Sequence, residues 1–196
     1  MHIATAKYIT SSTSYEQDPT GGAPAYAFIG RSNVGKSSLI NMIVQRKLAK
    51  TSSTPGKTKM INYFLVNDSW YLVDLPGYGW ANVPKRLKTQ WGKMVRAYIL
   101  RTPTLRHVFV LVDIRLTPQE KDIAFINWLG SKRIPFAIVF TKIDKVNQQR
   151  CTLHAQLFQD RLRMTWGALP PFFATSATKK KGREVLCRYM TALFDA

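Results

Sequence analysis

One eight-residue segment of this chain has the residue types and spacing of a phosphate site. Gly30-Arg31-Ser32-Asn33-Val34-Gly35-Lys36-Ser37 fits the pattern Gly-x4-Gly-Lys-Ser, and it follows an apolar run at 25–29. Glycines at both ends let the loop fold back, so that its amide groups and the next helix N-terminus face an anion. The pattern predicts that Lys36 reaches the β and γ phosphates of a nucleotide and that the Ser37 hydroxyl binds Mg²⁺.

A second motif, Asp74-Leu75-Pro76-Gly77, follows a later predicted strand. In P-loop sites an aspartate at a strand end helps to hold magnesium, often through bound water, and the Gly77 amide could contact a γ-phosphate. The loop between the two motifs offers three threonine hydroxyls for the metal, and spacing alone does not choose among Thr51, Thr54 and Thr58.

A third motif, Thr141-Lys142-Ile143-Asp144, follows the apolar run at 135–140 and could recognise a base. The Asp144 carboxylate can accept hydrogen bonds from guanine N1–H and N2–H₂, and adenine would leave it unpaired. The Lys142 stem can lie along the base, and Ser176-Ala177 would add a backbone contact near guanine O6. The alternative is a solvated turn, although strand-end loops are where such folds bind ligands.

The elements that must position these motifs alternate along the chain. Their order predicts an α/β fold, a mixed and mostly parallel six-stranded sheet with helices on both faces. We expect residues 1–22 to form a flexible arm and residues 23–196 to form one domain. The predicted strands span 25–29, 61–66, 70–73, 107–112, 135–140 and 171–175, and the predicted helices span 36–44, 118–129, 147–163, 183–194 and a stretch from residue 85.

Helical spacing of apolar residues indicates which helix faces point inward. Trp91 and Tyr98 share an apolar stripe, which favours a place in the core over stacking on nucleic-acid bases. In the last two helices the predicted inward residues are Leu153, Leu157, Leu162, Val185, Leu186, Tyr189 and Leu193.

Composition limits the class of protein. The chain is 45% hydrophobic, with no apolar run near the roughly 18 residues that cross a bilayer, and no secretory signal is expected at its start. Cys151 and Cys187 are far from any CxxC pattern, which predicts two reduced thiols and a cytoplasmic protein.

The net charge predicts a polyanionic partner. Lys and Arg number 29 against 11 Asp and Glu, a formal charge of +18, well above the 2 to 8 that is usual for a small domain. Residues 31–59 and 85–106 each hold seven Lys or Arg and no acid, and both stretches flank the nucleotide loops. Such a surface favours binding to nucleic acid or to an anionic membrane. Lys179-Lys180-Lys181 could be a solvated run.

With the motifs placed, the chain resembles the EngB (YihA/YsxC) GTPases of bacterial ribosome assembly, in the TrmE–Era-like superfamily. The resemblance covers roughly residues 24–194 and rests on Ala27–Asn41, Thr54-Pro55-Gly56-Lys57-Thr58, Val73–Gly79 and Thr141–Asp144. It implies a P-loop G domain that binds GTP or GDP with Mg²⁺, hydrolyses GTP slowly, and acts in late assembly of the large ribosomal subunit. It also implies a need for the protein in septation and cell division.

The resemblance selects Thr58 among the three threonines, so that Ser37, Thr58 and Asp74 would hold the metal. Lys36, Thr58 and Gly77 would serve catalysis. The partner would be ribosomal RNA on the basic surface, with no stable membrane association, and we expect a monomer. The predicted nucleotide-binding residues are Gly30, Arg31, Ser32, Asn33, Val34, Gly35, Lys36, Ser37, Ser38, Gly56, Lys57, Thr58, Asp74, Leu75, Pro76, Gly77, Thr141, Lys142, Asp144, Thr175, Ser176 and Ala177.

Two positions bear on the rate of hydrolysis. Tyr78 stands where Ras-like GTPases have a water-orienting glutamine, which predicts slow intrinsic turnover. Asn33 matches an asparagine with which related GTPases hold K⁺, and it could equally shape the loop. The alternative functions are a nucleotide-gated RNA-binding module with negligible hydrolysis and a membrane-associated GTPase. An ATP-dependent kinase is disfavoured by Asp144.

Overall fold

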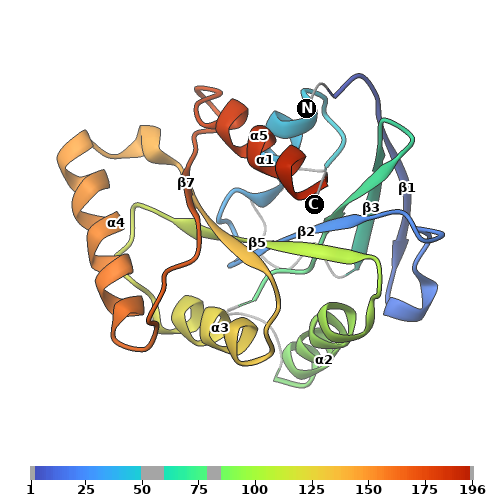
Figure 1. The fold of residues 1–196 in the computed structure, drawn as a ribbon, viewed down its shortest axis with the longest axis horizontal. Helices are drawn as coiled ribbons and strands as arrows, with labels where there is room; N and C mark the ends of the chain where they lie inside the picture. The colour runs from blue at the N-terminus through green and yellow to red at the C-terminus, as the bar shows by residue number, and fades with distance from the viewer. Residues whose placement is uncertain (1–2, 50–59, 79–84, 195–196) are drawn as a thin grey trace.

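The computed structural model describes residues 3–49, 60–78 and 85–194. Within them the chain forms an α/β layer structure around one sheet, shown in Figure 1. The strands are β1 (Ala6–Ser12), β2 (Ala25–Gly30), β3 (Ile61–Val66), β4 (Trp70–Asp74), β5 (Leu105–Asp113), β6 (Phe136–Thr141) and β7 (Phe172–Ala174). The helices are α1 (Lys36–Val44), α2 (Lys85–Arg101), α3 (Glu120–Ser131), α4 (Gln148–Arg163) and α5 (Arg183–Phe194), with short 3₁₀ turns at Tyr15–Gln17 and Ile143–Lys145.

The sheet is mixed, as predicted. Its order among the described residues is β1-β3-β4-β2-β5-β6-β7, and β2 pairs in parallel with both β4 and β5. Strand β3 is antiparallel to β4, and their three-residue connection has left-handed backbone at Asn67 and Asp68, with the Ser69 amide donating to the Val66 carbonyl oxygen at 3.1 Å. The central strands β2 and β6 are buried along their whole length because helices cover both faces.

Strand β1 was not expected. Six strands were predicted and residues 1–22 were expected to be a flexible arm, but the described part of the chain has seven strands, and β1 pairs antiparallel with β3 from Ala6 to Ser12. Its N-terminal end is further fixed to the hairpin turn, where the amides of Ala4 and Thr5 donate to Asn67 Oδ1. Residues Ala6–Ser12 therefore form an edge strand of the sheet and are not part of a flexible arm.

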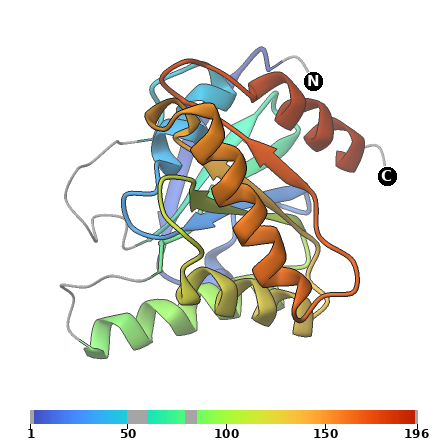
Figure 2. The ribbon, with the colours of Figure 1, turned by 90° about the vertical axis from the view of Figure 1, so that its left-hand side faces the viewer.

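Helices cover both faces and enclose two cores. Figures 1 and 2 show α1 and α5 on one side of the sheet and α2 and α3 on the other. Leu39 and Met190 lie in the first core, whereas Trp91 and Tyr98 of α2 are buried on the second side, as predicted. Arg183 joins α5 to α1, because its guanidinium donates to the carbonyl oxygens of Met42 and Ile43.

Helix phase was wrong by about one residue in α4. Three of the seven predicted inward residues are exposed: Leu153, Leu157 and Val185. In α4 the buried positions are instead His154 and Phe158, each one place further along, together with Leu162. The His154 Nδ1 atom hydrogen-bonds the carbonyl oxygen of Ile114, so a polar residue takes an inward position that the apolar pattern gave to leucine.

Both cysteines are free thiols, as predicted, and neither is fully exposed. In the described ranges no helix combines the length and apolar character needed to traverse a membrane.

A buried histidine makes folding sensitive to acid. His107 of β5 is 4% exposed, its ring packs against Phe109 and Tyr189, and the Tyr189 hydroxyl lies 3.4 Å from Nε2. Because burial disfavours the charged ring, the pKa of His107 falls from 6.5 to about 4. Between these values the unfolded chain binds a proton that the folded chain does not, so the free energy of unfolding falls as pH drops.

We therefore expect His107→Phe to remove about 3 kcal/mol of the stability difference between neutral pH and pH 4, since one pKa unit corresponds to about 1.4 kcal/mol. The measurement is urea unfolding of both proteins across this range. Other titrating groups affect wild type and variant alike, so the difference between the two curves isolates His107. Parallel curves would show that the histidine is protonated without cost in the folded state.

Candidate nucleotide-binding site

The predicted motifs converge at one edge of the sheet. Strands β2, β4, β5, β6 and β7 run in the same direction, so their carboxyl ends meet there. These ends carry the phosphate loop (residues 30–37), Asp74, Asp113, Thr141 and the turn after β7. Carboxyl ends of parallel strands are where open α/β sheets bind ligands.

The phosphate loop has a backbone that side chains would block. Gly35 has φ of 101°, a left-handed conformation, and α1 begins directly after it with no side chain capping its first amides. A Cβ at Gly30 would lie 2.7 Å from the Leu111 carbonyl oxygen of β5. The two predicted glycines are therefore required by geometry, and the helix N-terminus is left open toward the loop.

Two polar atoms of this loop are consistent with a bound anion. The Ser32 hydroxyl and Arg31 Nε are buried and have no hydrogen-bond partner within the described part of the chain. Buried polar groups are normally paired. Together with the uncapped helix N-terminus, these donors fit a phosphate group. Ser37 is half-buried and Ser38 exposed in the first turn of α1, and Val34 is buried beneath the loop.

Lys36 and Asp74 lie in direct contact, although the sequence predicted a different ligand for each. The Lys36 ammonium donates to Asp74 Oδ1, and both side chains are more than nine-tenths buried. Burial lowers the pKa of Lys36 to about 7, while the carboxylate beside it favours the charged ammonium. The contact joins the start of α1 to the end of β4. One carboxylate and one hydroxyl suit Mg²⁺, which keeps several waters and phosphate oxygens as ligands.

The segment after Asp74 is attached to the phosphate loop by its backbone. Leu75 and Gly77 are buried, and a Cβ at Gly77 would lie 2.6 Å from the Gly30 carbonyl oxygen. The Tyr78 amide donates to that same carbonyl at 3.1 Å, and the Ser32 amide donates to the Tyr78 carbonyl at 3.3 Å. Asp74-Leu75-Pro76-Gly77 is thus brought beside the phosphate loop, as predicted.

The Tyr78 side chain faces α3. Its ring stacks on Phe125, with centroids 4.8 Å apart, and its hydroxyl is buried. Burial raises the pKa of Tyr78 well above its ordinary value, so the phenol is neutral at physiological pH.

Lys142 joins the base loop (residues 141–144) to the phosphate loop. Its ammonium donates to the Asn33 carbonyl oxygen at 2.5 Å and to Asp113 Oδ2 at 2.8 Å. The stem passes the phosphate loop at Gly35, where an added Cβ would lie 3.6 Å from Lys142 Cε. Thr141 adds a second link, because its hydroxyl donates to the Val34 carbonyl oxygen at 2.6 Å.

Asp144 is oriented by the turn after β7. The Ser176 hydroxyl donates to Asp144 Oδ1 at 2.6 Å, and the Ile143 amide donates to the Thr175 carbonyl at 3.3 Å. The hydrogen bond from Ser176 lowers the pKa of Asp144, so the carboxylate stays ionised. Thr175 and Ser176 are buried and Ala177 is half-buried. The predicted base residues are therefore neighbours, and one carboxylate oxygen stays outside the serine contact.

Asp113 is a site residue that the sequence motifs did not predict. It ends β5 between the phosphate and base loops, where it accepts from Lys142 and forms a two-bond pair with Arg115. These donors hold the pKa of Asp113 below its ordinary value, against the effect of burial. Its position at the end of a predicted parallel strand was the available signal.

Some predicted residues lie outside the described ranges. This applies to Gly56, Lys57 and Thr58, and to the competing Thr51 and Thr54. Their roles remain predictions.

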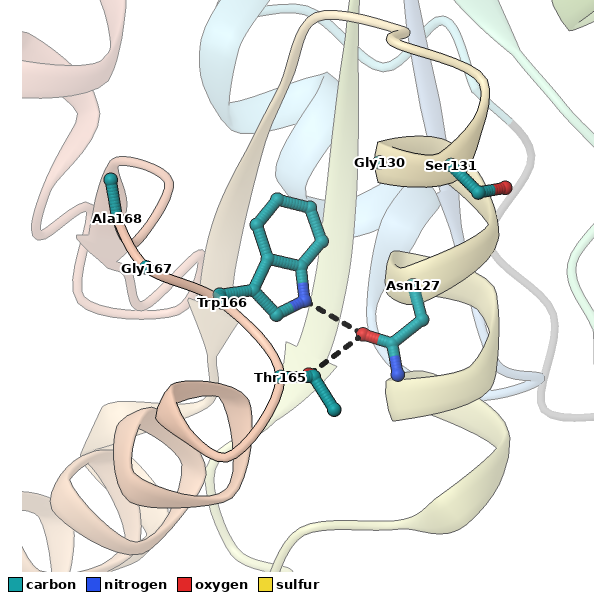
Figure 3. Close-up of a pocket in the computed structure, with 7 residues that line it drawn as sticks. All are labelled: Asn127, Gly130, Ser131, Thr165, Trp166, Gly167 and Ala168. Carbon is teal, nitrogen blue, oxygen red and sulfur yellow. Dashed lines mark hydrogen bonds between the residues drawn. The ribbon is translucent and has the colours of Figure 1, made fainter.

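A separate hollow of about 460 Å³ lies between α3 and the loop that follows α4. Figure 3 shows the Trp166 indole directed toward Asn127, and its Nε1 donates to Asn127 Oδ1 at 2.7 Å. An added Cβ at Gly130 would lie 2.2 Å from the indole, so the ring packs tightly on that glycine. The predicted site residues do not line this hollow, which is a seam between two elements.

Comparison with known proteins agrees with this geometry. The family model described as 50S ribosome-binding GTPase matches residues 25–142. A probable GTP-binding protein EngB of Bacteroides fragilis is 48% identical over 98% of this chain and 96% of its own length. Its counterpart in Bacteroides thetaiotaomicron is 48% identical over 97% of this chain and 95% of its own.

A solved structure shares the fold. The crystal structure of a probable GTP-binding protein engB superposes with a TM-score of 0.68, at 24% identity, and covers 86% of this chain and 97% of that one. The α/β P-loop architecture predicted from the motifs is confirmed.

Proposed function

The chain belongs to the EngB family of GTP-binding proteins, and we propose that it is a slow GTPase switch in late assembly of the large ribosomal subunit. The observation that carries the proposal is the base loop, in which Asp144 is held by Ser176 while Lys142 binds the phosphate loop. This arrangement suits a guanine base and the phosphates of the same nucleotide. We further propose that the protein acts as a cytoplasmic monomer without stable membrane association.

The chain's own residues would bind and orient GTP. The amides at the start of α1 and the Lys36 ammonium would hold the phosphates. Ser37, Thr58 and Asp74 would hold Mg²⁺, which neutralises charge on the β and γ oxygens. The Gly77 amide would contact the γ-phosphate and thereby link the nucleotide state to the segment that follows.

The proposed slow rate rests on Tyr78. Its ring is stacked on Phe125 and its hydroxyl is buried, so it offers no amide to orient water toward a phosphate. The same observation favours the alternative of an RNA-binding module with negligible hydrolysis, and multiple-turnover phosphate release separates the two.

Potassium is a further part of the proposal. Asn33 has left-handed backbone and an exposed side chain, which suits either a K⁺ ligand or a loop-shaping residue. Higher GTPase rates in K⁺ than in Na⁺ would support the K⁺ role.

A basic surface supports the proposed ribosomal RNA partner. Arg86, Lys93, Arg96 and Arg101 of α2 are exposed, and Arg106 follows at the start of β5. No carboxylate in the described ranges forms an ion pair with these five side chains, so their charge is available to phosphates. Helix α2 begins after the segment that follows Gly77, which would let the nucleotide state control docking. A defect in cell division would follow from failed ribosome production.

The test is co-sedimentation with purified large ribosomal subunits in GDP, in a non-hydrolysable GTP analogue and without nucleotide. We expect binding in the analogue, weakened by rising salt because counterions are released on docking. Charge reversal at Arg86 and Lys93 to Glu should abolish this binding. The matched control is Lys181→Glu with Arg188→Glu, an equal charge change at two exposed residues just before and on α5, the helix that lies across the sheet from α2 (Figures 1 and 2). Binding that is equal in all three states, or insensitive to salt, would contradict the proposal.

A further inference from the structure

A row of polar side chains crosses three strands and ends at Asp74. The register pairs Ser11 of β1 with Asn62 of β3, and Asn62 with Asp74 of β4. Asn62 shares its strand face with Phe64, which packs in the core beneath α1. The row therefore lies on the α1 side, and it connects the edge of the sheet with the carboxylate that contacts Lys36.

Hydrogen bonds run along the whole row. The Tyr8 hydroxyl lies 2.8 Å from Ser11 Oγ, and Ser11 Oγ donates to Asn62 Oδ1 at 2.6 Å. Asn62 Nδ2 then donates to Asp74 Oδ2 at 3.4 Å, and the other oxygen of that carboxylate accepts from Lys36. Exposure falls along the row, from Tyr8 at 51% to Asp74 at 3%.

The chemistry of the groups fixes the direction of each bond. An ionised carboxylate only accepts, so the amide of Asn62 must turn its NH₂ group toward Asp74. Its carbonyl oxygen then faces Ser11, which must donate. The serine oxygen in turn accepts from Tyr8. Each member therefore orients the next, ending at Asp74 Oδ2.

A β-bulge makes this row possible. Residues three apart on a regular strand point to opposite faces, which would separate Tyr8 from Ser11. The register of β1 shifts between Tyr8 and Thr10, so that Tyr8 pairs with Phe64 while Ser11 pairs with Asn62. Bulges re-aim side chains in this way. The bulge in the edge strand thus brings Tyr8 and Ser11 to the same face of the sheet.

We propose that Asn62 is a positioning residue for the Asp74 carboxylate, and that Ser11 of β1 orients Asn62. With Oδ2 accepting from the amide, the carboxylate is oriented with Oδ1 toward Lys36, and the same oxygen would face the water shell of a bound Mg²⁺. Partners in such an outer shell often change metal affinity when they are removed. The inference rests on the proposed role of Asp74 in magnesium binding.

The experiment measures release of a fluorescent GDP at increasing Mg²⁺, for wild type and variants. We expect Asn62→Ala to raise the Mg²⁺ concentration that half-slows release by about tenfold. Ser11→Ala should raise it less, by about threefold, because it acts through Asn62. The double variant should equal Asn62→Ala, since both changes break one row. Release rates in excess chelator should agree within about twofold for all variants, because the proposed effect needs the metal.

Two further variants separate positioning from packing. Asn62→Leu keeps the volume of the side chain and removes the donor, so it should behave like Asn62→Ala, whereas Asn62→Gln keeps a donor and should restore much of the Mg²⁺ response. Thr10→Ala is the control, on the same strand but on the opposite face from Ser11. Thermal unfolding of each variant checks that the fold is kept.

The response of the wild type to Mg²⁺ separates a failure of the metal site from a failure of the positioning role of Asn62. If Mg²⁺ does not slow GDP release from the wild type, the proposed metal site fails and this inference fails with it. If the wild type responds and Asn62→Leu responds at the same Mg²⁺ concentration, the positioning role alone is overturned.

Discussion

Asp144→Asn should exchange the nucleotide specificity of this protein from guanine to xanthine. The carboxylate would accept from guanine N1–H and N2–H₂, and losing these charge-assisted bonds should weaken GDP binding by about 100-fold or more. Xanthine carries an oxygen where guanine carries N2. The Ser176 hydroxyl, which now donates to Asp144 Oδ1, would donate to the amide oxygen and leave the NH₂ group facing that new acceptor.

Titration calorimetry with GDP, XDP and ADP measures the loss of GDP affinity and the gain of XDP affinity. The gain of XDP binding matters most, because a misfolded variant cannot gain affinity. Asp160→Asn is the control, an identical chemical change at an exposed aspartate of α4 that pairs with Arg163. Unchanged GDP affinity in Asp144→Asn would place the base elsewhere.

Lys36→Met should remove both nucleotide binding and much of the stability of the nucleotide-free protein. The variant leaves the Asp74 carboxylate, 3% exposed, without its ammonium partner. Breaking one side of a buried ion pair costs about 3–5 kcal/mol, because the remaining charge is uncompensated. Affinity for GTP should fall by at least about 100-fold, since the ammonium would be the charged donor to the phosphates.

The double variant Lys36→Met with Asp74→Asn separates these two effects. It removes both charges, so we expect most of the lost stability to return while GTP binding stays lost. Urea unfolding without nucleotide and calorimetric titration with GTP measure the two quantities. Lys132→Met, at an exposed position after α3, controls for the change of residue type. If Lys36→Met unfolds like the wild type, the buried pair contributes nothing to the fold.

The sequence predicted those parts of the fold that depend on local pattern. Helices 36–44 and 183–194 have the predicted bounds, because a glycine precedes each and apolar residues recur at helical spacing within them. The strand before the phosphate loop was visible as an apolar run, since β2 is buried on both faces. The three motifs were identified as one site because parallel strands bring their carboxyl ends together.

The features that the sequence did not predict depend mainly on pairing between strands. Strand β1 is an edge strand rich in Ser and Thr, and its bulge breaks the alternation that would have revealed it. Asn62 and Asp113 belong to none of the three sequence motifs. Their contacts arise from the register and the order of the strands. The predicted inward face of α4 was wrong because His154 occupies a buried position, where its ring hydrogen-bonds the carbonyl oxygen of Ile114. The spacing of apolar residues cannot indicate such a position.

Multiple-turnover phosphate release from GTP and from ATP by the wild-type protein measures hydrolysis and guanine recognition in one experiment. We expect slow but repeated turnover of GTP and no turnover of ATP, because Asp144 would find no donors on adenine. Comparable turnover of both nucleotides would contradict guanine recognition by the base loop. Binding of GTP without repeated turnover would contradict the proposed GTPase switch and favour the nucleotide-gated RNA-binding module.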